Sequence, residues 1–488
     1  MRFNLRLVLR IIGLLLIIEA VLLGGVCSGV AWYYGETTIY DFAQSGALTL
    51  VVGLVLSLIG WGCRKNITRR EGVVIVTFVW LVYCVFGMLP FLSSGVMSRV
   101  VDAWFETMSG FTTTGASVVE NLDEWPRSLL LWRSLMQWSG GLGIIVVCLA
   151  LLPTLGFRGM QLFGSDIQTT PQKVSRRVSE SSRQLILIYI VLTVVETVCL
   201  KVVGMGWFDA VNHSMTTIAT AGFSTHQASI AAFNSPVIEY VIIVFMFLSG
   251  VNFTLYYLAF TGTSVKKVLK NDELRAYTWI VVLFTIVMIL LTTSIWDEWS
   301  IEYAEEHFRD ALFQVVSLIT TTGFATEDYV QWSSVSKIVI YLVLLFGACY
   351  GSTSGGIKVS RMAIAFKYCY NEIRRMIRPN MVYPIVYGGN TLRTEQVAHI
   401  FSFIVLYVFF ASVGSLILGL SGMGLEEAVG SMASCLATDG PGMGMTGPAS
   451  SYADVSDFVK WFLSGVMLVG RMDIFIVLLL FTPAFWRR

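Results

Sequence analysis

Long apolar stretches govern what this chain can fold into. A transmembrane helix needs about 20 consecutive apolar residues, and ten stretches of the sequence approach or exceed that length. They lie near residues 7–33, 46–62, 71–93, 128–152, 184–206, 236–261, 275–296, 336–368, 396–421 and 458–485. Only 13% of the 488 residues are charged, compared with roughly 25% in a soluble domain. The sequence therefore predicts an all-α integral membrane protein with about ten transmembrane helices.

Lysine and arginine gather in alternate loops between these stretches. If each stretch crosses the membrane once, the basic loops fall on one face: residues 64–70, 154–183, 266–275, 358–393 and the C-terminal WRR. The loops on the other face are acidic and aromatic. Because cytoplasmic loops hold the excess of Lys and Arg, the pattern predicts a multi-pass protein with both termini in the cytoplasm.

Composition and motifs exclude several classes of function. The net charge is +1 and the basic residues are dispersed, so nothing indicates a nucleic-acid partner. The eight cysteines form no CxxC pair, which argues against a disulfide framework or a zinc site. Enzyme motifs such as HExxH, GxSxG and GxxxxGK[ST] are absent from the sequence, and we expect no enzymatic activity and no covalently bound cofactor.

Four short segments between the long stretches repeat one pattern in register. They cover residues 102–116, 209–223, 310–324 and 427–441. Each opens with an acid, has a threonine eleven residues later and a glycine two residues after that. The acids are Asp102, Asp209, Asp310 and Glu427, the threonines Thr113, Thr220, Thr321 and Thr438, and the glycines Gly115, Gly222, Gly323 and Gly440. Ordinary turns between surface helices are the alternative interpretation, but they have no reason to match four times.

The repeat predicts a re-entrant half-helix followed by irregular backbone. An acid in the first turn of a helix meets the free N–H groups and the positive end of the dipole. About three turns separate it from the threonine, roughly 17 Å, which is too short to cross a bilayer. The predicted units are a two-helix extension and four helix–pore–helix repeats around a central pore. Their boundaries are residues 1–70, 71–153, 154–265, 266–378 and 379–488.

Non-helical backbone at membrane depth is tolerated where it lines a cavity. We expect an extended Thr-x-Gly strand whose carbonyl oxygens replace the water shell of a cation, with glycine at positive φ, as in the filter of a potassium channel. The predicted filter residues are Thr113, Thr114, Gly115, Thr220, Ala221, Gly222, Thr321, Thr322, Gly323, Thr438, Asp439 and Gly440. The sequence therefore predicts a fourfold ring of oxygen ligands for a monovalent cation.

With the four repeats, the segments LWRSLMQWSGGLGIIVV, SGVNFTLYY, GACYGSTSGGIKVSR and MLVGRMDIFIVLLLFTPAFW make the chain resemble the TrkH/KtrB family of bacterial potassium-uptake subunits. The two helices before the first repeat make it similar to the TrkH branch, because KtrB-type chains usually begin near that repeat. The resemblance implies potassium as the transported ion, bound at the filter, and a homodimer in the bacterial inner membrane. It also implies a cytosolic TrkA-like nucleotide-binding ring (NAD or ATP) that controls opening.

The stretch 336–368 is too long for one crossing and contains a run of small residues. They include Gly347, Gly351, Ser352, Thr353, Ser354, Gly355 and Gly356. Backbone freedom at such residues favours an intramembrane loop. Close helix packing through Gly347 and Gly351 is the alternative. The family resemblance implies that this loop lies under the filter and acts as a gate.

Arg471 lies inside the apolar stretch 458–485. A charge at that depth costs at least a few kcal/mol unless it meets water, carbonyls or an acid, so it is a candidate functional residue. It could place a barrier in a cation path and bond the carbonyls of the loop at 347–356, a pairing that the resemblance implies. A structural ion pair with Asp473 is the alternative, although the i,i+2 spacing places the two on different helix faces.

Asp439 departs from the small or apolar residue expected before the filter glycine. We expect its side chain to point behind the filter and brace it through hydrogen bonds; pointing inward, it would place a negative charge at the mouth. His213 and Gln314 are interpreted as packing residues and Glu106 as a solvated or dipole-pairing acid. A secondary transporter coupled to sodium or protons is the competing class, since transporters also use broken helices and internal repeats.

Overall fold

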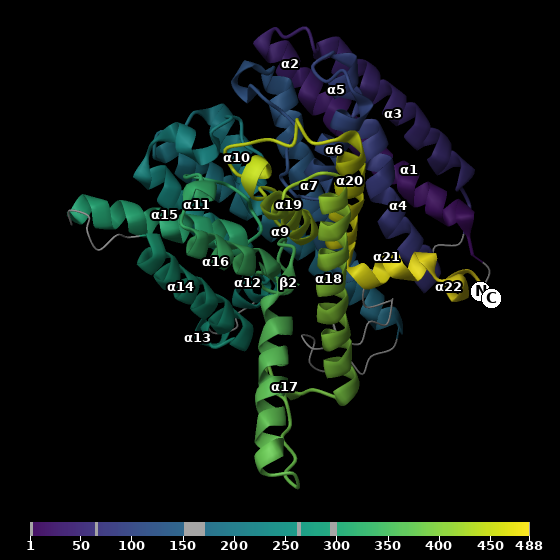
Figure 1. The fold of residues 1–488 in the computed structure, drawn as a ribbon. Helices are drawn as coiled ribbons and strands as arrows, with labels where there is room; N and C mark the ends of the chain where they lie inside the picture. Colours follow the sequence, from purple (N-terminus) through teal and green to yellow (C-terminus); the bar gives the residue numbers. More distant parts are fainter. Residues whose placement is uncertain (1–2, 64–66, 151–170, 261–264, 293–299, 488) are drawn as a thin grey trace.

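The computed structural model describes residues 3–63, 67–150, 171–260, 265–292 and 300–487. These residues form helices and four two-residue strands (Figure 1). Residues 64–66 of the predicted loop 64–70, most of the loop 154–183 and the end of the stretch 275–296 lie outside the described residues. The all-α fold class predicted from the sequence is confirmed.

Two antiparallel helices precede the first repeat. The first crossing is α1 (Leu5–Val21), continued without a break by the π-helical turn η1 (Leu22–Cys27) and by α2 (Ser28–Tyr34), and the second is α3 (Ile39–Ile59). The two crossings pack closely through glycine: a Cβ on Gly46 would clash with the backbone of Gly24 in η1. Such small-residue contacts are how apolar helices approach each other in a membrane.

The first two repeats follow one element order: a long helix, a half-helix, an irregular segment and a second helix. In repeat 1 these elements are α4 (Arg69–Gly87) with α5 (Leu89–Ser93), α6 (Val100–Phe111), η2 (Leu122–Glu124) and α7 (Arg127–Ala150). In repeat 2 they are α9 (Pro171–Val202), α10 (Trp207–Ile218), η4 (Ser229–Phe233), and α11 (Pro236–Ser249) with α12 (Phe253–Phe260).

Repeats 3 and 4 keep this order, and a hairpin that begins with α17 lies between them. Repeat 3 contains α13 (Val265–Leu269), α14 (Asp272–Thr292), α15 (Ile301–Ile319), η5 (Tyr329–Gln331), α16 (Ser334–Leu345), the parallel pair β1 (Phe346–Gly347) and β2 (Ile357–Lys358), and α17 (Val359–Ile377). The antiparallel pair β3 (Val386–Tyr387) and β4 (Asn390–Thr391) follows. Repeat 4 contains α18 (Thr394–Leu420), α19 (Leu425–Ala437), η6 (Gly444–Thr446), α20 (Asp457–Met472), α21 (Ile474–Phe481) and α22 (Pro483–Trp486).

Local sequence sets several of these boundaries. Thr68 and Glu71 form a capping box at the start of α4, in which the Glu71 carboxylate accepts the Thr68 N–H at 2.8 Å. The same carboxylate accepts the N–H of Asn4 at 2.8 Å and so joins the N-terminal helix to repeat 1. Pro236 occupies the first position of α11, where its missing N–H costs nothing.

The predicted crossings correspond to helices, but the stretch 336–368 is interrupted between α16 and α17 and two further stretches bend sharply. Within the described residues, six helices are long and apolar enough to span a membrane, or up to eight if each bent pair counts as one span. The stretch 236–261 bends by 88° between α11 and α12, and the stretch 458–485 bends by 112° between α20 and α21. The second bend occurs at Asp473, whose φ of 72° is incompatible with a continuing α-helix. Hydropathy reports apolar length and not direction, so the sequence did not predict these bends.

Three of the four repeat acids lie in the first turn of their half-helices, as predicted: Asp102 in α6, Asp209 in α10 and Glu427 in α19. Asp310 does not. Ser300 caps α15 more than two turns earlier, accepting the N–H of Tyr303 at 3.0 Å. The residues between Ser300 and Asp310 extend α15 at its N-terminus. Asp310 therefore lies inside the helix and not in its first turn.

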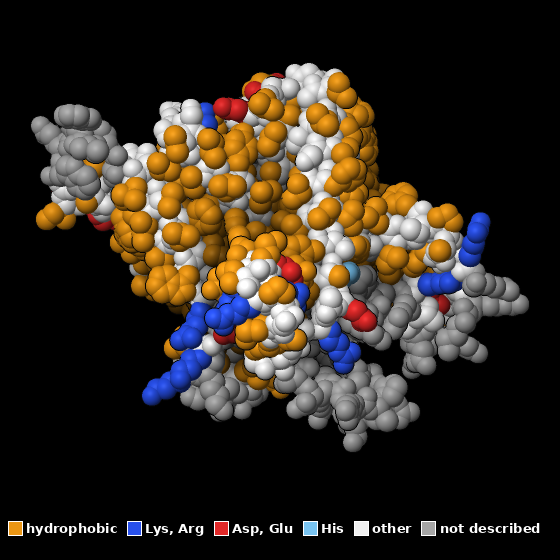
Figure 2. All heavy atoms as spheres, turned by 60° about the horizontal axis from the view of Figure 1, so that its bottom comes forward, with side chains coloured by type: hydrophobic (Ala, Val, Ile, Leu, Met, Phe, Trp, Pro, Cys, Tyr) orange, Lys and Arg blue, Asp and Glu red, His pale blue; other side chains and the backbone are white. Residues whose placement is uncertain are grey.

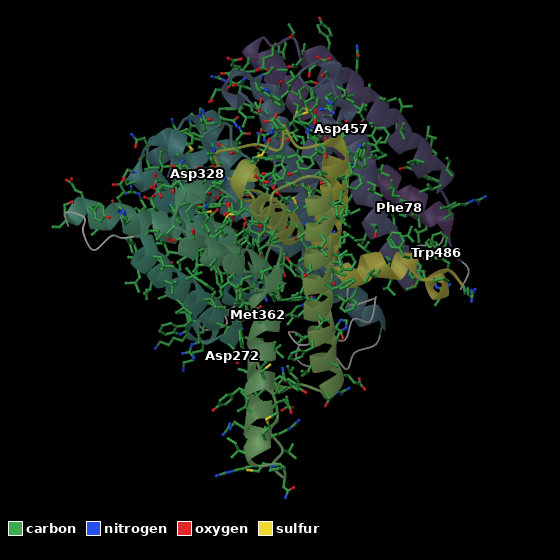
Figure 3. The ribbon with its side chains drawn as sticks, in the orientation of Figure 1. Phe78, Asp272, Asp328, Met362, Asp457 and Trp486 are labelled. Carbon is green, nitrogen blue, oxygen red and sulfur yellow. The ribbon has the colours of Figure 1, made fainter. Side chains whose placement is uncertain are left out.

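In Figure 1 the half-helices α6, α10 and α19 lie among the long helices, α15 extends to the left edge, and connecting loops lie at the top of the view. Asp328 and Asp457 lie toward this end, whereas Asp272 and Met362 lie toward the opposite end, from which α17 projects (Figure 3). Lysine and arginine gather around the projecting α17 hairpin and the C-terminal helix, while the surface behind them is mostly hydrophobic (Figure 2). The exposed basic residues of the hairpin are Lys367, Arg374, Arg375, Arg378 and Arg393.

Candidate ion-conducting site

Each half-helix ends in the same hydrogen-bonded turn. In repeat 1 the N–H of Thr113 donates to Gly110 O at 3.0 Å, and the N–H of Thr114 donates to Ser109 O at 2.9 Å. The same two bonds recur in the other repeats, from Thr220 and Ala221, from Thr321 and Thr322, and from Thr438 and Asp439. This is the Schellman pattern that closes a helix when the residue after its last turn is left-handed.

Threonine takes the left-handed position in all four turns. The φ angles of Thr113, Thr220, Thr321 and Thr438 are 54°, 52°, 54° and 57°. Glycine is the usual residue there, and a β-branched residue in this region is an outlier that costs on the order of 1–3 kcal/mol. The predicted extended strand is therefore wrong for these residues. The backbone turns left-handed at the threonine and again at the glycine, where φ is 85°, 76°, 76° and 108° in repeats 1 to 4.

The four glycines of the predicted filter form a closed ring. A Cβ added to Gly115 would clash with the carbonyl oxygen of Ala221, one on Gly222 with that of Thr322, and one on Gly323 with that of Asp439. A Cβ on Gly440 would lie 2.7 Å from the carbonyl oxygen of Thr114, which completes the circle. Each glycine thus faces the residue before the glycine of the next repeat. The expectation that the four glycines surround one axis agrees with this geometry.

The ring opens into a cavity on the side of the half-helix N-termini. All four glycines line it, together with residues that follow them in the chain, among them Ser117, His226 and Tyr452. His226 and Asp123 at its rim form a pair with Nδ1 and Oδ1 2.6 Å apart. Among the described residues there is no cluster of His, Cys, Asp or Glu suited to a metal ion.

The fourth residue after each repeat acid forms a hydrogen bond with the segment that follows the predicted filter glycine. Glu106 accepts the N–H of Val118 at 3.0 Å, and His213 Nε2 lies 3.0 Å from Ser224 Oγ. In repeat 3 the amide of Gln314 donates to Glu327 O at 3.2 Å, and in repeat 4 the hydroxyls of Ser431 and Thr446 are 2.8 Å apart. The interpretation of His213 and Gln314 as packing residues agrees with these contacts.

The expectation that Glu106 is solvated is wrong. Its side chain is fully buried and accepts a hydrogen bond from Arg133 Nε at 2.8 Å. Arg133 also donates to Ser224 O at 3.0 Å, and its guanidinium lies 4.0 Å from the ring centroid of Phe223. The pair thus joins α6, α7 and the segment after the second filter.

Sequence reasoning missed Arg133 and also Gln137, one turn further along α7. Gln137 Nε2 donates to Ala221 O at 2.6 Å, and its Oε1 accepts the N–H of Phe223 at 3.0 Å. The sequence contained a signal for both residues. A charged group and an amide four residues apart in a predicted apolar crossing are energetically unfavourable unless they contact polar groups.

Three of the repeat acids accept hydrogen bonds from side chains outside the glycine ring. Asp102 accepts a hydrogen bond from the buried Lys460 at 2.7 Å and so joins the first and fourth repeats. Asp209 accepts from Thr225 Oγ1 at 2.8 Å and Asp310 from Thr326 Oγ1 at 3.3 Å, in each case from the third residue after the filter glycine. Asp102 and Asp209 therefore anchor the N-terminal turns of α6 and α10, whereas Asp310 makes its contact from within α15.

Asp439 is fully buried, and within the described residues neither carboxylate oxygen has a hydrogen-bond partner. The donors required by the predicted bracing are therefore missing. The hydroxyl of Tyr407 on α18 is also buried and without a partner in that part of the chain. Burial of an unpaired carboxylate is strongly unfavourable.

The stretch 336–368 is interrupted as predicted, between α16 and α17. The irregular segment lies directly against the inner end of the filter: the N–H of Gly355 donates to Thr321 Oγ1 at 2.8 Å. Thr353 Oγ1 donates to Ile218 O, the last residue of α10, at 3.1 Å. A Cβ on Gly355 would clash with the carbonyl oxygen of Ala437 at the end of α19. These contacts need a loop without bulky side chains.

Arg471 lies in the last turn of α20 and is buried. Its Nη1 donates to Thr353 O at 2.7 Å and its Nη2 to Gly140 O at 3.3 Å. Asp473, the acid of the alternative ion pair, accepts a hydrogen bond from Arg361 Nη2 at 2.8 Å. The guanidinium thus connects α20 with the interrupted loop and with α7.

The fold and the site together define a class of protein: a helical membrane protein in which four helix–pore–helix repeats surround one axis. Residues 40–488 match the family model TrkH, described as "Cation transport protein", and the chain belongs to this family. It is 36% identical to the Trk system potassium uptake protein TrkH of Escherichia coli K12 over 490 residues, covering 99% of both chains. It is 37% identical to TrkH of Vibrio parahaemolyticus over 489 residues, again covering 99% of both.

A solved structure has the same fold. The crystal structure of the potassium transporter TrkH from Vibrio parahaemolyticus superimposes with a TM-score of 0.90 at 36% sequence identity. The match covers 99% of this chain and 100% of that one. The four-repeat architecture is therefore shared over the full length of both proteins.

Proposed function

We propose that this chain is the potassium-translocating subunit of a bacterial Trk-type uptake system, a gated pore whose filter is contributed by the four repeats. The closed ring of Gly115, Gly222, Gly323 and Gly440 is the observation on which the proposal rests. The names of the full-length relatives, potassium uptake proteins, support it. The proposed repeat boundaries are residues 71–153, 154–265, 266–378 and 379–488, after an extension of residues 1–70.

Potassium is the substrate, and the residues around the ring supply its ligands. The twelve filter positions of the Thr-x-Gly segments offer main-chain carbonyls that replace the water shell of the ion. Two threonine hydroxyls, of Thr113 and Thr438, are buried without a hydrogen-bond partner in the described part of the chain, which leaves them free to coordinate. The C-terminal ends of the half-helices add negative potential at the same level. We expect no other cofactor.

The loop at 347–356 and Arg471 form the gate in this proposal. The loop occupies the inner end of the filter, and the guanidinium beneath it opposes a cation through electrostatic repulsion. Opening requires the loop to leave Thr321 and Arg471 to move away from Thr353. The gate residues are Gly347, Gly351, Ser352, Thr353, Ser354, Gly355, Gly356 and Arg471.

The assembly belongs to the same proposal. We place the chain in the bacterial inner membrane as a homodimer, with both termini in the cytoplasm. A cytosolic TrkA-like nucleotide-binding ring is the proposed regulator, and the exposed basic residues of the α17 hairpin lie on the face that the positive-inside rule assigns to the cytoplasm (Figure 2). Purification with a co-expressed TrkA-type protein tests this part directly.

The decisive experiment is ion flux through the purified chain in liposomes. We expect potassium flux down an imposed gradient, with only moderate exclusion of sodium, because one glycine per repeat offers fewer stacked sites than a longer filter. Flux that is linear in the potassium driving force supports a pore. Flux that requires a sodium or proton gradient would instead establish the symport alternative, and the absence of potassium flux with and without a TrkA-type partner would overturn the proposal.

A further inference from the structure

Gln137 holds the filter of repeat 2 from a neighbouring repeat. It lies on α7 of repeat 1 and is fully buried. Its amide bonds the residues on both sides of Gly222: Nε2 donates to Ala221 O at 2.6 Å, and Oε1 accepts the N–H of Phe223 at 3.0 Å. A primary amide is the side chain that can donate and accept at adjacent positions in this way.

The contact makes the ring asymmetric. In the described part of the chain, the carbonyls of Thr114, Thr322 and Asp439, which correspond to that of Ala221, accept no hydrogen bond from a side chain. The nearest parallel is the Tyr452 hydroxyl, which donates at 3.1 Å to Gly440 O in repeat 4. Repeat 2 alone therefore has a side-chain donor on the carbonyl that faces the neighbouring glycine.

The neighbouring turn of α7 keeps the amide in place. Arg133, four residues before Gln137 and on the same helix face, donates to Ser224 O at 3.0 Å and pairs with Glu106 at 2.8 Å. Ala221 O, Phe223 N and Ser224 O are therefore all bonded to one face of α7. Packing and the ion pair leave Gln137 little freedom to turn away.

Two effects on ion preference follow from this geometry. The N–H dipole occupies one lone pair of Ala221 O and opposes its negative potential, so this oxygen offers a cation a weaker field. A weaker field disfavours the smaller sodium ion, which gains most from strong ligands at short distance. The two bonds also restrain residues 221–223 from moving inward, and such movement would be needed to coordinate the smaller ion.

We propose that Gln137 is a positioning residue that sets the preference of the pore for potassium over sodium. This inference rests on the proposed function, since it assigns the selectivity of that same filter. Gln137 does not itself bind the ion; it acts through Ala221 and Phe223.

The test measures potassium and sodium flux side by side in liposomes containing the full-length chain. Gln137→Met keeps the shape of the side chain and removes both hydrogen bonds. Gln137→Glu keeps an acceptor for Phe223 N and removes the amide donor to Ala221 O. Ser134→Ala is the matched control, because the buried Ser134 hydroxyl donates to Leu130 O within the same helix and has no other hydrogen-bond partner among the described residues.

We expect the potassium-to-sodium flux ratio to fall by about fivefold in Gln137→Met, the factor equivalent to one net hydrogen bond, and to fall in Gln137→Glu as well. Ser134→Ala should keep the wild-type ratio. An unchanged ratio in either Gln137 variant that elutes as folded protein, including an equal loss of both fluxes, would overturn the inference. Wild-type liposomes without potassium flux, both with and without a TrkA-type partner, would instead refute the proposed function, so the two failures are distinguishable.

Discussion

Arg471 on α20 donates a hydrogen bond to the carbonyl oxygen of Thr353 at 2.7 Å, although 118 residues separate the two in the chain. Its second bond, to Gly140 O at 3.3 Å, reaches α7. One buried guanidinium thus fixes the loop under the filter relative to two other repeats. In the proposed pore, its positive charge and its bonds would both have to be displaced for a cation to pass.

The first prediction concerns this contact. Arg471→Ala should raise potassium flux through the chain without its regulator by about tenfold or more, because each ~1.4 kcal/mol removed from a barrier changes a rate tenfold. Liposome flux assays measure the effect. Arg375→Ala is a control on the exposed part of α17, where Arg375 pairs with Glu372 outside the pore. Equal flux in wild type and Arg471→Ala would remove Arg471 from the gate.

The second prediction concerns the ring. Gly323→Ala should abolish potassium flux, because the added methyl clashes with Asp439 O and alanine is strained at a φ of 76°. Gly465→Ala on α20 is the matched control: no atom lies within 4 Å of its added Cβ. Flux should survive in the control and disappear in Gly323→Ala while both proteins elute as folded chains. Normal flux in Gly323→Ala would show that ions do not use the ring.

The in-register pattern of acid, threonine and glycine was sufficient to predict the half-helices and the grouping of the glycines. Residues such as Gly323 are constrained by their own backbone, so local sequence identifies them. The left-handed conformation of Thr113 and its counterparts was not predictable in the same way, since the Schellman turn normally selects glycine. Threonine is retained there against its backbone preference, which is consistent with a use for its hydroxyl.

The spacing of residues in the sequence could not predict contacts between different repeats. Gln137 and Ala221 belong to different repeats, and their bond depends on how α7 packs against the second filter. Asp310 shows a different limit: the repeat pattern gave its position, but the capping residue Ser300 decided where its helix begins. The bend at Asp473 likewise depends on one residue in a stretch whose hydropathy is uniform.

The third prediction concerns Asp439, the buried acid before Gly440. Since its carboxylate has no hydrogen-bond donor among the described residues, removal of the charge should relieve a desolvation cost. We expect Asp439→Asn to melt at a higher temperature in detergent than the wild type and to retain the same potassium-to-sodium flux ratio. A changed ratio would show that the carboxylate acts on the permeating ion and does not lie behind the filter.

The fourth prediction concerns the buried pair of Glu106 and Arg133. Both side chains are almost completely buried and 2.8 Å apart, and each also bonds the segments that follow the first two filters. Removing one partner leaves the other charge uncompensated, which typically costs about 3–5 kcal/mol. Glu106→Leu and Arg133→Met should therefore each lower the melting temperature and the yield of folded protein.

The double variant separates the ion pair from its surroundings. With Glu106→Leu and Arg133→Met combined, no unpaired charge remains, and replacing a buried ion pair by apolar residues is often close to neutral. The double variant should therefore melt at a higher temperature than either single variant, with a coupling free energy of about 0.5–3 kcal/mol in the double-mutant cycle. If the losses of stability in the two single variants add up in the double variant, the ion pair itself is not the source of the stabilisation. The hydrogen bonds to Val118 N and Ser224 O, which the double variant also lacks, would then account for it.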